Sequence, residues 1–150
     1  MTVRLRDSAD NSVREAIVGP LVAYNDSQTG GNDYKPLALT VEDSDNEIVG
    51  GLWGRTYYGW LFVELLFIPE TLRKRGLGTE ILLRAEQEAI ARGCHSVWLD
   101  TYEFQARGFY ERLGYRCFGQ LDNYPAGFSR YFMKKTLTTS DSRVGQTHPP

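Results

Sequence analysis

The 150-residue chain has few of the residues that build metal centres and disulfide frameworks. It contains two cysteines, Cys94 and Cys117, and two histidines, His95 and His148. Two cysteines cannot form a disulfide scaffold, and their spacing excludes a Cys-x-x-Cys zinc motif. We therefore expect a protein without a metal site.

The chain also lacks long hydrophobic runs and a strong excess of one charge. No stretch approaches the 18 apolar residues of a membrane span, and residues 1–20 hold no apolar segment typical of a signal peptide. Lys and Arg number 17 against 19 Asp and Glu, a net charge of −2, which argues against general nucleic-acid binding. These absences predict a cytoplasmic protein that binds neither membranes nor nucleic acids.

What the chain does have is enough apolar sequence for one globular domain. Hydrophobic residues make up 41% and charged residues 24%, ordinary values for a globular protein. A chain of this length buries roughly 70% of its unfolded surface. Residues 138–150 hold one aliphatic side chain, Val144, and therefore predict a disordered tail. The expected domain spans residues 1–137.

The apolar pattern predicts a mixed sheet with helices packed against it, an α/β (α+β) sandwich. Alternation predicts a short first strand at 3–5. A helix is expected from Ser12, kinked or split at Pro20, and then a polar loop over 25–35. Further strands are predicted at 37–41, 48–58, 60–68, 96–101, 115–121 and 129–137, and helices at 79–92 and 106–113. The nearly continuous apolar run 60–68 predicts a central strand that is buried on both faces.

The most informative segment is 73–79, which reads Arg-Lys-Arg-Gly-Leu-Gly-Thr between a strand and a helix. Backbone N–H groups at a helix start are unpaired and carry partial positive charge, and glycine lets a ligand approach them closely. The segment therefore predicts a phosphate or pyrophosphate site. It is neither a Walker A loop nor a Gly-x-Gly-x-x-Gly motif. A plain cationic surface loop is the alternative.

Two side chains are candidates for catalysis. Glu64 is the one charged residue in the run 61–68, and desolvation of a carboxylate favours its protonated form, a property suited to a general base. The alternative is that Glu64 lies at a sheet edge or pairs with Arg55. Tyr110 stands at helical spacing with Leu113, which makes it a core aromatic unless it lines a site.

Aromatic residues make up 13% of the chain, and several lie at turns where a core does not need them. Such residues can line a pocket for an amphipathic or cationic ligand. The candidates for substrate binding are Trp53, Tyr57, Tyr58, Tyr102 and Tyr124.

Three segments resemble the GNAT superfamily of acetyl-CoA-dependent N-acetyltransferases. Residues 73–78 match the family's Arg/Gln-x-x-Gly-x-Gly/Ala pyrophosphate loop, and the preceding Phe-Ile-Pro-Glu at 67–70 matches the family's entry to that loop. Residues 106–115 resemble the family's Tyr-x-x-x-Gly-Phe/Tyr segment. The resemblance covers about residues 3–137.

The resemblance implies a strongly bent mixed sheet of about seven strands with helices on both faces and two central strands splayed apart around acetyl-CoA. It implies that Tyr110 donates a proton to the leaving thiolate, and it places Glu64 at a position where some members carry a base. The family's CoA-binding Asn is replaced here by Glu103, and Gln105 is the nearest amide. The remaining cofactor-binding residues that it implies are Phe67, Ile68, Arg73, Arg75, Gly76, Leu77, Gly78 and Thr79.

The function implied is direct transfer of an acetyl group to a primary amine of a small molecule, without a metal. Acetylation of a protein N-terminus or lysine is the first alternative, and a non-catalytic acyl-CoA-binding domain is the second. The aromatic and acidic residues favour a closed pocket for a small molecule, while intact Gly76, Gly78 and Tyr110 argue against a non-catalytic domain. Homodimers are common in the family, although the sequence shows no interface.

Overall fold

The computed structural model describes residues 1–138 and divides into two compact units, one from Met1 to Asp33 and one that begins at Tyr34. Each unit is considered by itself. Residues 139–150, the rest of the predicted tail, lie outside the described residues.

The first unit contains one helix, α1 (Asn11–Thr29). Asp10 caps its start by accepting a hydrogen bond from the Val13 N–H at 3.2 Å. The prediction of a split at Pro20 was wrong, and so was the predicted loop from residue 25, because the helix continues to Thr29. Gly19 helps to explain this continuity: it has no Cβ to clash with the proline ring. The predicted strand at 3–5 is absent, since residues 1–10 form no strand with any described segment.

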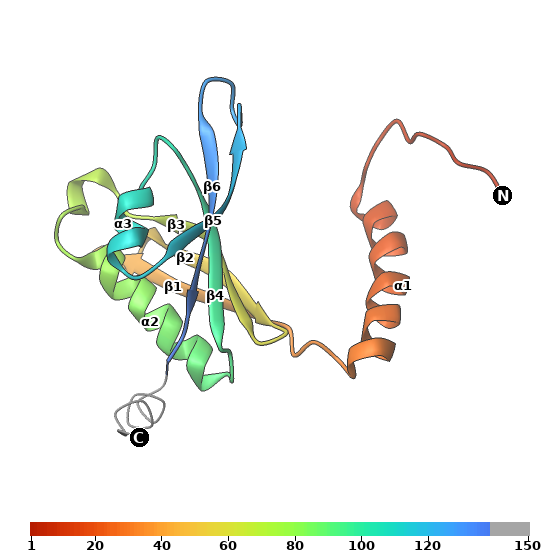
Figure 1. Ribbon diagram of the computed structural model, residues 1–150, viewed down its shortest axis with the longest axis horizontal. Helices are drawn as coiled ribbons and strands as arrows, with labels where there is room; N and C mark the ends of the chain where they lie inside the picture. The colour runs from red at the N-terminus through yellow and green to blue at the C-terminus, as the bar shows by residue number, and fades with distance from the viewer. Residues whose placement is uncertain (139–150) are drawn as a thin grey trace, which may run out of the picture. The chain divides into compact units, whose positions relative to one another are not determined.

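The second unit is a six-stranded mixed sheet with two α-helices and one 3-10 helix (Figure 1). The strands lie in the order β1-β2-β3-β4-β6-β5, with β3 and β4 parallel and the other neighbouring pairs antiparallel. This confirms the mixed sheet with helices and corrects the number of strands from about seven to six. The elements are β1 (Lys35–Glu42), β2 (Ile48–Tyr57), β3 (Trp60–Phe67), η1 (Glu70–Leu72), α2 (Leu77–Ala91), β4 (Ser96–Tyr102), α3 (Arg107–Arg112), β5 (Arg116–Asp122) and β6 (Ser129–Thr136).

The core lies on one face of the sheet, between the central strands and the helices α2 and α3. Alternate residues of β3 and β4 enter it, and burying each large aliphatic side chain contributes about 1.5–3 kcal/mol. Coverage of the opposite face by a helix stays a prediction. The central members of this core are Leu61, Val63, Leu82, Ala85, Val97, Leu99, Tyr110 and Met133.

Burial of β3 on both faces was predicted and is wrong for the second half of the strand. Leu61, Phe62 and Val63 are buried, whereas Glu64, Leu65 and Phe67 are exposed. The first half pairs with strands on both sides, and the second half pairs with β2 alone. The end of β3 is therefore open along one edge.

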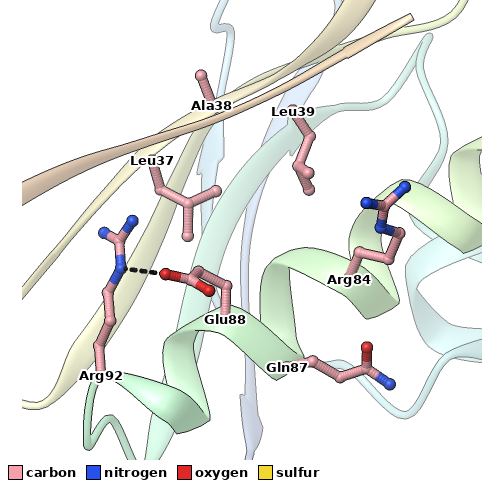
Figure 2. A pocket seen from close by; sticks show the side chains of 7 residues that line it. All are labelled: Leu37, Ala38, Leu39, Arg84, Gln87, Glu88 and Arg92. Atoms are coloured by element: carbon pink, nitrogen blue, oxygen red, sulfur yellow. Dashed lines mark hydrogen bonds and ion pairs between the residues drawn. The ribbon is translucent and has the colours of Figure 1, made fainter.

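Hydrogen bonds from Arg92 link the end of α2 to the edge strand β1. Its Nη1 donates to the carbonyl oxygens of Lys35 and Pro36 at 3.2 and 3.1 Å, and its Nε donates to Glu88 at 3.0 Å. Figure 2 shows this ion pair beside a hollow between α2 and β1. The volume of the hollow is about 460 Å³. None of the predicted site residues lines this hollow, so it plays no part in the candidate site.

Candidate active site

The two parallel strands β3 and β4 pair only over their first four residues, from Trp60 opposite Ser96 to Val63 opposite Leu99. Beyond that point β3 continues along β2, and β4 continues along β6. Residues 64–67 and 100–102 therefore diverge and leave an opening between the strands. An unpaired strand edge presents N–H and C=O groups that an extended ligand can bind as an added strand.

A β-bulge stands where the opening begins. Trp53 pairs with Leu65 and Gly54 pairs with Val63, so Glu64 is an extra residue on β3. A side chain at position 54 is excluded, because a Cβ there would lie 2.4 Å from the carbonyl oxygen of Phe62. Bulges leave one residue outside the ladder and re-aim its side chain, and they are frequent beside active sites.

Glu64 is not the buried carboxylate that the apolar run predicted. Its side chain is 45% exposed, and its Oε2 lies 3.4 Å from Nη1 of Arg55 across the β2–β3 hairpin. The alternative, pairing with Arg55, is the one that the structure shows. Glu64 still stands at the opening, which is the position that a base would need.

The turn before α2 offers backbone donors to an anion. Gly76 is the N-cap residue with a φ of 79°, and no side chain caps the helix. The first intrahelical bond from this turn is donated by the Glu80 N–H to the Gly76 carbonyl, which leaves the N–H groups of the first turn without intrahelical acceptors. An αL glycine, free amides and flanking cations together fit a phosphate group.

Two residues in this region, Arg73 and Gly78, also stabilise the local fold. Arg73 Nε donates to the Ile68 carbonyl oxygen at 2.9 Å, so that side chain braces the chain between β3 and α2. A Cβ on Gly78 would meet the Phe109 ring at 3.4 Å, so the missing side chain lets α3 pack close to the start of α2. The predicted contacts of Phe67, Ile68, Arg75, Leu77 and Thr79 with a cofactor stay predictions.

Tyr110 is both a core aromatic and a free donor. It is 7% exposed, and its ring packs edge-on against Phe109 and Tyr115 at 5.1 and 5.8 Å between centroids. Burial, and then the negative charge of Asp100, raise the pKa of Tyr110 to about 12. No hydrogen bond within residues 1–138 engages its hydroxyl group. The phenol is therefore protonated at neutral pH and available to a ligand.

The two polar residues at the position of the family's Asn build the loop between β4 and α3. Gln105 Oε1 accepts from the Tyr102 N–H at 2.8 Å and from the Thr101 hydroxyl at 3.2 Å. Glu103 exchanges two hydrogen bonds with the backbone of Ser129, at 2.8 and 2.9 Å. Binding of a cofactor by Gln105 stays a prediction, because the structure gives its oxygen a different partner.

The predicted substrate-binding aromatics fall into separate groups. Tyr57 and Tyr58 contact each other at 5.6 Å in the β2–β3 turn, at the end of β3 away from the opening. Trp53 is 48% exposed on β2, level with the bulge. Tyr102 and Tyr124 lie 6.1 Å apart beyond the open end of β4. Tyr102 and Tyr124 thus lie at the end of β4 that separates from β3, whereas the hairpin tyrosines lie at the opposite end of β3.

Sequence reasoning missed one ion pair at this site. Arg130 Nε on β6 donates to Oδ1 of Asp100 on β4 at 2.8 Å, and Nη2 of Arg130 lies 2.7 Å from the same oxygen in an ion pair. Asp100 interrupts the apolar strand 97–101 much as Glu64 interrupts β3, and that pattern could have singled it out. Over residues 1–138, no group of three or more His, Cys, Asp or Glu side chains is placed to share a metal ion, and no helix is long and apolar enough to cross a membrane.

Comparison with known proteins supports the resemblance. The acetyltransferase (GNAT) family matches residues 14–115. The chain is 41% identical over 135 residues to an acetyltransferase of Agrobacterium fabrum, covering 90% of this chain and 98% of that protein. It is 39% identical over 92 residues to blasticidin-S acetyltransferase of Streptomyces morookaense, covering 61% and 68% of the two chains.

A crystal structure of a protein from Agrobacterium tumefaciens has the same fold, with a TM-score of 0.86 and 40% identity over 91% of this chain and 99% of that one. The expectation drawn from the pyrophosphate loop and the segment around Tyr110 is confirmed. The chain belongs to the GNAT family of acetyltransferases and is an acyltransferase.

Proposed function

We propose that the protein transfers an acetyl group from acetyl-CoA to a primary amine of a small molecule. One observation carries the proposal: β3 and β4 separate after Val63 and Leu99, and the chain leads from β3 to a turn with free amides and from β4 to the helix that carries Tyr110, whose buried hydroxyl has no partner in the described residues. Membership of the GNAT family supports acetyl-CoA as the donor. A relative named for its action on blasticidin S, a small molecule, supports the acceptor class.

Donor binding follows from the backbone of this chain. The amides of Arg75, Gly76, Gly78 and Thr79 surround the turn and would hold the pyrophosphate, where the positive end of the helix dipole adds to hydrogen bonding. The open edge of β3 near Phe67 would pair with the pantetheine arm in the manner of an added strand. Bound in this way, acetyl-CoA supplies an activated thioester.

In the reaction a C–N bond forms and the C–S bond breaks; the attacking amine loses one proton and the sulfur gains one. An amine that arrives as an ammonium ion first gives up a further proton. A backbone amide freed by the bulge would polarise the acetyl carbonyl. Tyr110 would donate a hydrogen bond to the thioester sulfur. Because an ordinary thiol has a pKa of about 8.5, below that of this phenol, Tyr110 would stabilise the leaving thiolate by a hydrogen bond, and the thiolate would take its proton from solvent water as CoA leaves. Glu64 would take the amine proton, directly or through a water molecule.

Gly78→Asp tests the anion site. The carboxylate would stand against the pyrophosphate, so we expect the Kd for acetyl-CoA to rise tenfold or more, at least about 1.4 kcal/mol, by calorimetry. Gly78→Ala is the matched control, because it adds the same Cβ beside Phe109 without the charge. An acidic residue in the first turn favours the helix, whereas the added Cβ crowds Phe109, so thermal unfolding of both variants separates a loss of affinity from a loss of stability. Equal affinities of the Asp and Ala variants would remove this turn from the donor site.

Glu64→Gln tests the base. The change keeps the shape of the side chain, and loss of its exposed contact with Arg55 costs little stability. We expect the rate defect to be largest at low pH, where the amine is mostly protonated, and to shrink as the pH approaches the pKa of the amine. The measurement is a pH–rate profile of both proteins. A defect of the same size at every pH would leave Glu64 as a binding or structural residue.

The acceptor class is tested by measuring CoA release with a panel of blasticidin S, aminoglycosides, polyamines and peptides. Turnover of small-molecule amines but not of peptides supports the proposal. Turnover of peptides alone would make the protein a protein N-acetyltransferase. Tight binding of acetyl-CoA without turnover of any amine would indicate a non-catalytic acyl-CoA-binding domain.

A further inference from the structure

The strand β4 places Asp100 at the mouth of the opening. It follows Leu99, the last residue of β4 that pairs with β3, so it is the first residue on the free part of the strand. Its neighbours Leu99 and Thr101 are 1% and 2% exposed. Because successive side chains of a strand point to opposite faces, Asp100 lies on the face away from the Leu99 side chain and the core. Glu64 occupies the corresponding first free position on β3.

One oxygen of the Asp100 carboxylate is fixed and the other is free. Oδ1 accepts a hydrogen bond from Arg130 Nε at 2.8 Å and lies 2.7 Å from Arg130 Nη2 in an ion pair, while no hydrogen bond from residues 1–138 reaches Oδ2. The side chain is 15% exposed, so a ligand can reach it although it is mostly covered. Charge-assisted pairing of this kind holds a carboxylate in a defined orientation.

Arg130 is itself held by aromatic rings. Its guanidinium carbon lies 5.3 Å from the ring centroid of Tyr102, 4.7 Å from that of Tyr124 and 5.4 Å from that of Phe132. Cation–π contacts of this length stabilise a partly desolvated cation. The three rings therefore fix the position of the Arg130 guanidinium, and its ion pair with Asp100 fixes the orientation of the carboxylate. Glu64, in contrast, is 45% exposed and has a single 3.4 Å contact, so it is far less rigidly placed.

The face of the sheet from which the acceptor amine approaches determines whether it contacts Asp100 or Glu64. The anion-binding turn begins α2, and α2 packs on the core face of the sheet. A donor bound at that turn would enter the opening from the core face, so an attacking amine must come from the opposite face. That face carries Asp100.

We propose that Oδ2 of Asp100 binds the ammonium group of the acceptor, with Arg130 as the positioning residue that orients the carboxylate. This inference rests on the proposed function and names the residue that holds its acceptor, an amine that arrives as a cation. The charged amine is held at Asp100, and Glu64, on the other strand of the opening, removes the proton before attack. Asp100 acts here by binding, so its loss affects acceptor affinity more than the chemical step.

Asp100→Asn in the full chain tests the inference, with the amine that the wild type acetylates most rapidly in the panel above. We expect the KM for that amine to rise tenfold or more, with kcat lowered less than threefold and the Kd for acetyl-CoA within twofold of the wild type. Asp45→Asn, an exposed aspartate in the β1–β2 turn, is the control and should change none of these values.

Loss of Asp100 also leaves Arg130 without its carboxylate, so a second variant separates binding from local structure. Asp100→Asn combined with Arg130→Gln removes both charges, and we expect the high KM to persist in it. A double variant that regains the wild-type KM, or a single variant with an unchanged KM, would overturn the inference while leaving the proposed function intact. A wild type that releases no CoA with any amine would overturn both.

Discussion

Replacing Tyr110 with phenylalanine is expected to lower kcat roughly 10- to 10³-fold, in line with the loss of one proton or hydrogen-bond donor at a reacting atom. The Kd for acetyl-CoA and the melting temperature should stay close to the wild type. Stability is retained because the hydroxyl has no hydrogen bond to lose within residues 1–138, while the ring keeps its contacts with Phe109 and Tyr115. Steady-state kinetics, calorimetry and thermal unfolding measure the three quantities.

The pH dependence of the Tyr110 defect follows from its pKa. Burial and the Asp100 charge raise this pKa to about 12, and a raised pKa keeps the phenol in its proton-bearing form at higher pH. The ratio of wild-type to variant kcat should therefore be constant between pH 6 and 10. The upper limit of this range is about two pH units below the pKa of Tyr110, so the phenol stays protonated throughout.

Tyr115→Phe is the matched control for Tyr110→Phe. The Tyr115 hydroxyl donates to Glu86 at 2.9 Å, so this change should lower stability by about 1 kcal/mol and leave kcat unaffected. An unchanged kcat in Tyr110→Phe itself would reduce Tyr110 to a core aromatic.

The features that the sequence predicted well are set by local chemistry. The turn at Gly76 and the helix after it depend on neighbouring residues, because glycine supplies the positive φ and the following residues have helical apolar spacing. Tyr110 is similar, because its helical spacing predicted its place in the core. The same burial raises the pKa of its phenol, so the hydroxyl stays protonated at neutral pH. The structure shows the core packing of Tyr110, and the role of its hydroxyl toward the leaving sulfur stays a prediction.

The features that failed depend on partners distant in the sequence. The apolar run of β3 predicted burial on both faces. In the structure β4 separates from β3 after Leu99 and continues along β6, and the sequence of the run itself does not indicate where its neighbouring strand ends its pairing. Glu64 therefore stands exposed at a bulge whose register is set by Gly54 on the neighbouring strand. The pairing of Asp100 was missed for the same reason, since its partner Arg130 is 30 residues away, although its charge within an apolar strand is visible in the sequence.

Away from the opening, a buried charged network ties α2 to the last strand. Glu86 on α2 has a side chain that is 7% exposed. Its Oε1 accepts from Nζ of Lys135 on β6 at 2.7 Å, and its Oε2 accepts from the Tyr115 hydroxyl. Both oxygens are thus satisfied, which is the condition under which a buried carboxylate is tolerated.

Glu86→Ala is expected to lower the free energy of unfolding by about 3–5 kcal/mol, because it leaves the Lys135 ammonium and the Tyr115 hydroxyl partly buried without their acceptor. Glu80→Ala on the same helix is the control: its side chain is 59% exposed and 3.8 Å from Arg84, so its effect should stay within about 0.5 kcal/mol. Urea unfolding measures both, and Glu86→Gln, which keeps an acceptor for Tyr115, should fall between them. If Glu86→Ala were as stable as Glu80→Ala, the network would contribute nothing to stability, and the attachment of α2 would rest on the apolar core and on the hydrogen bonds of Arg92 to β1.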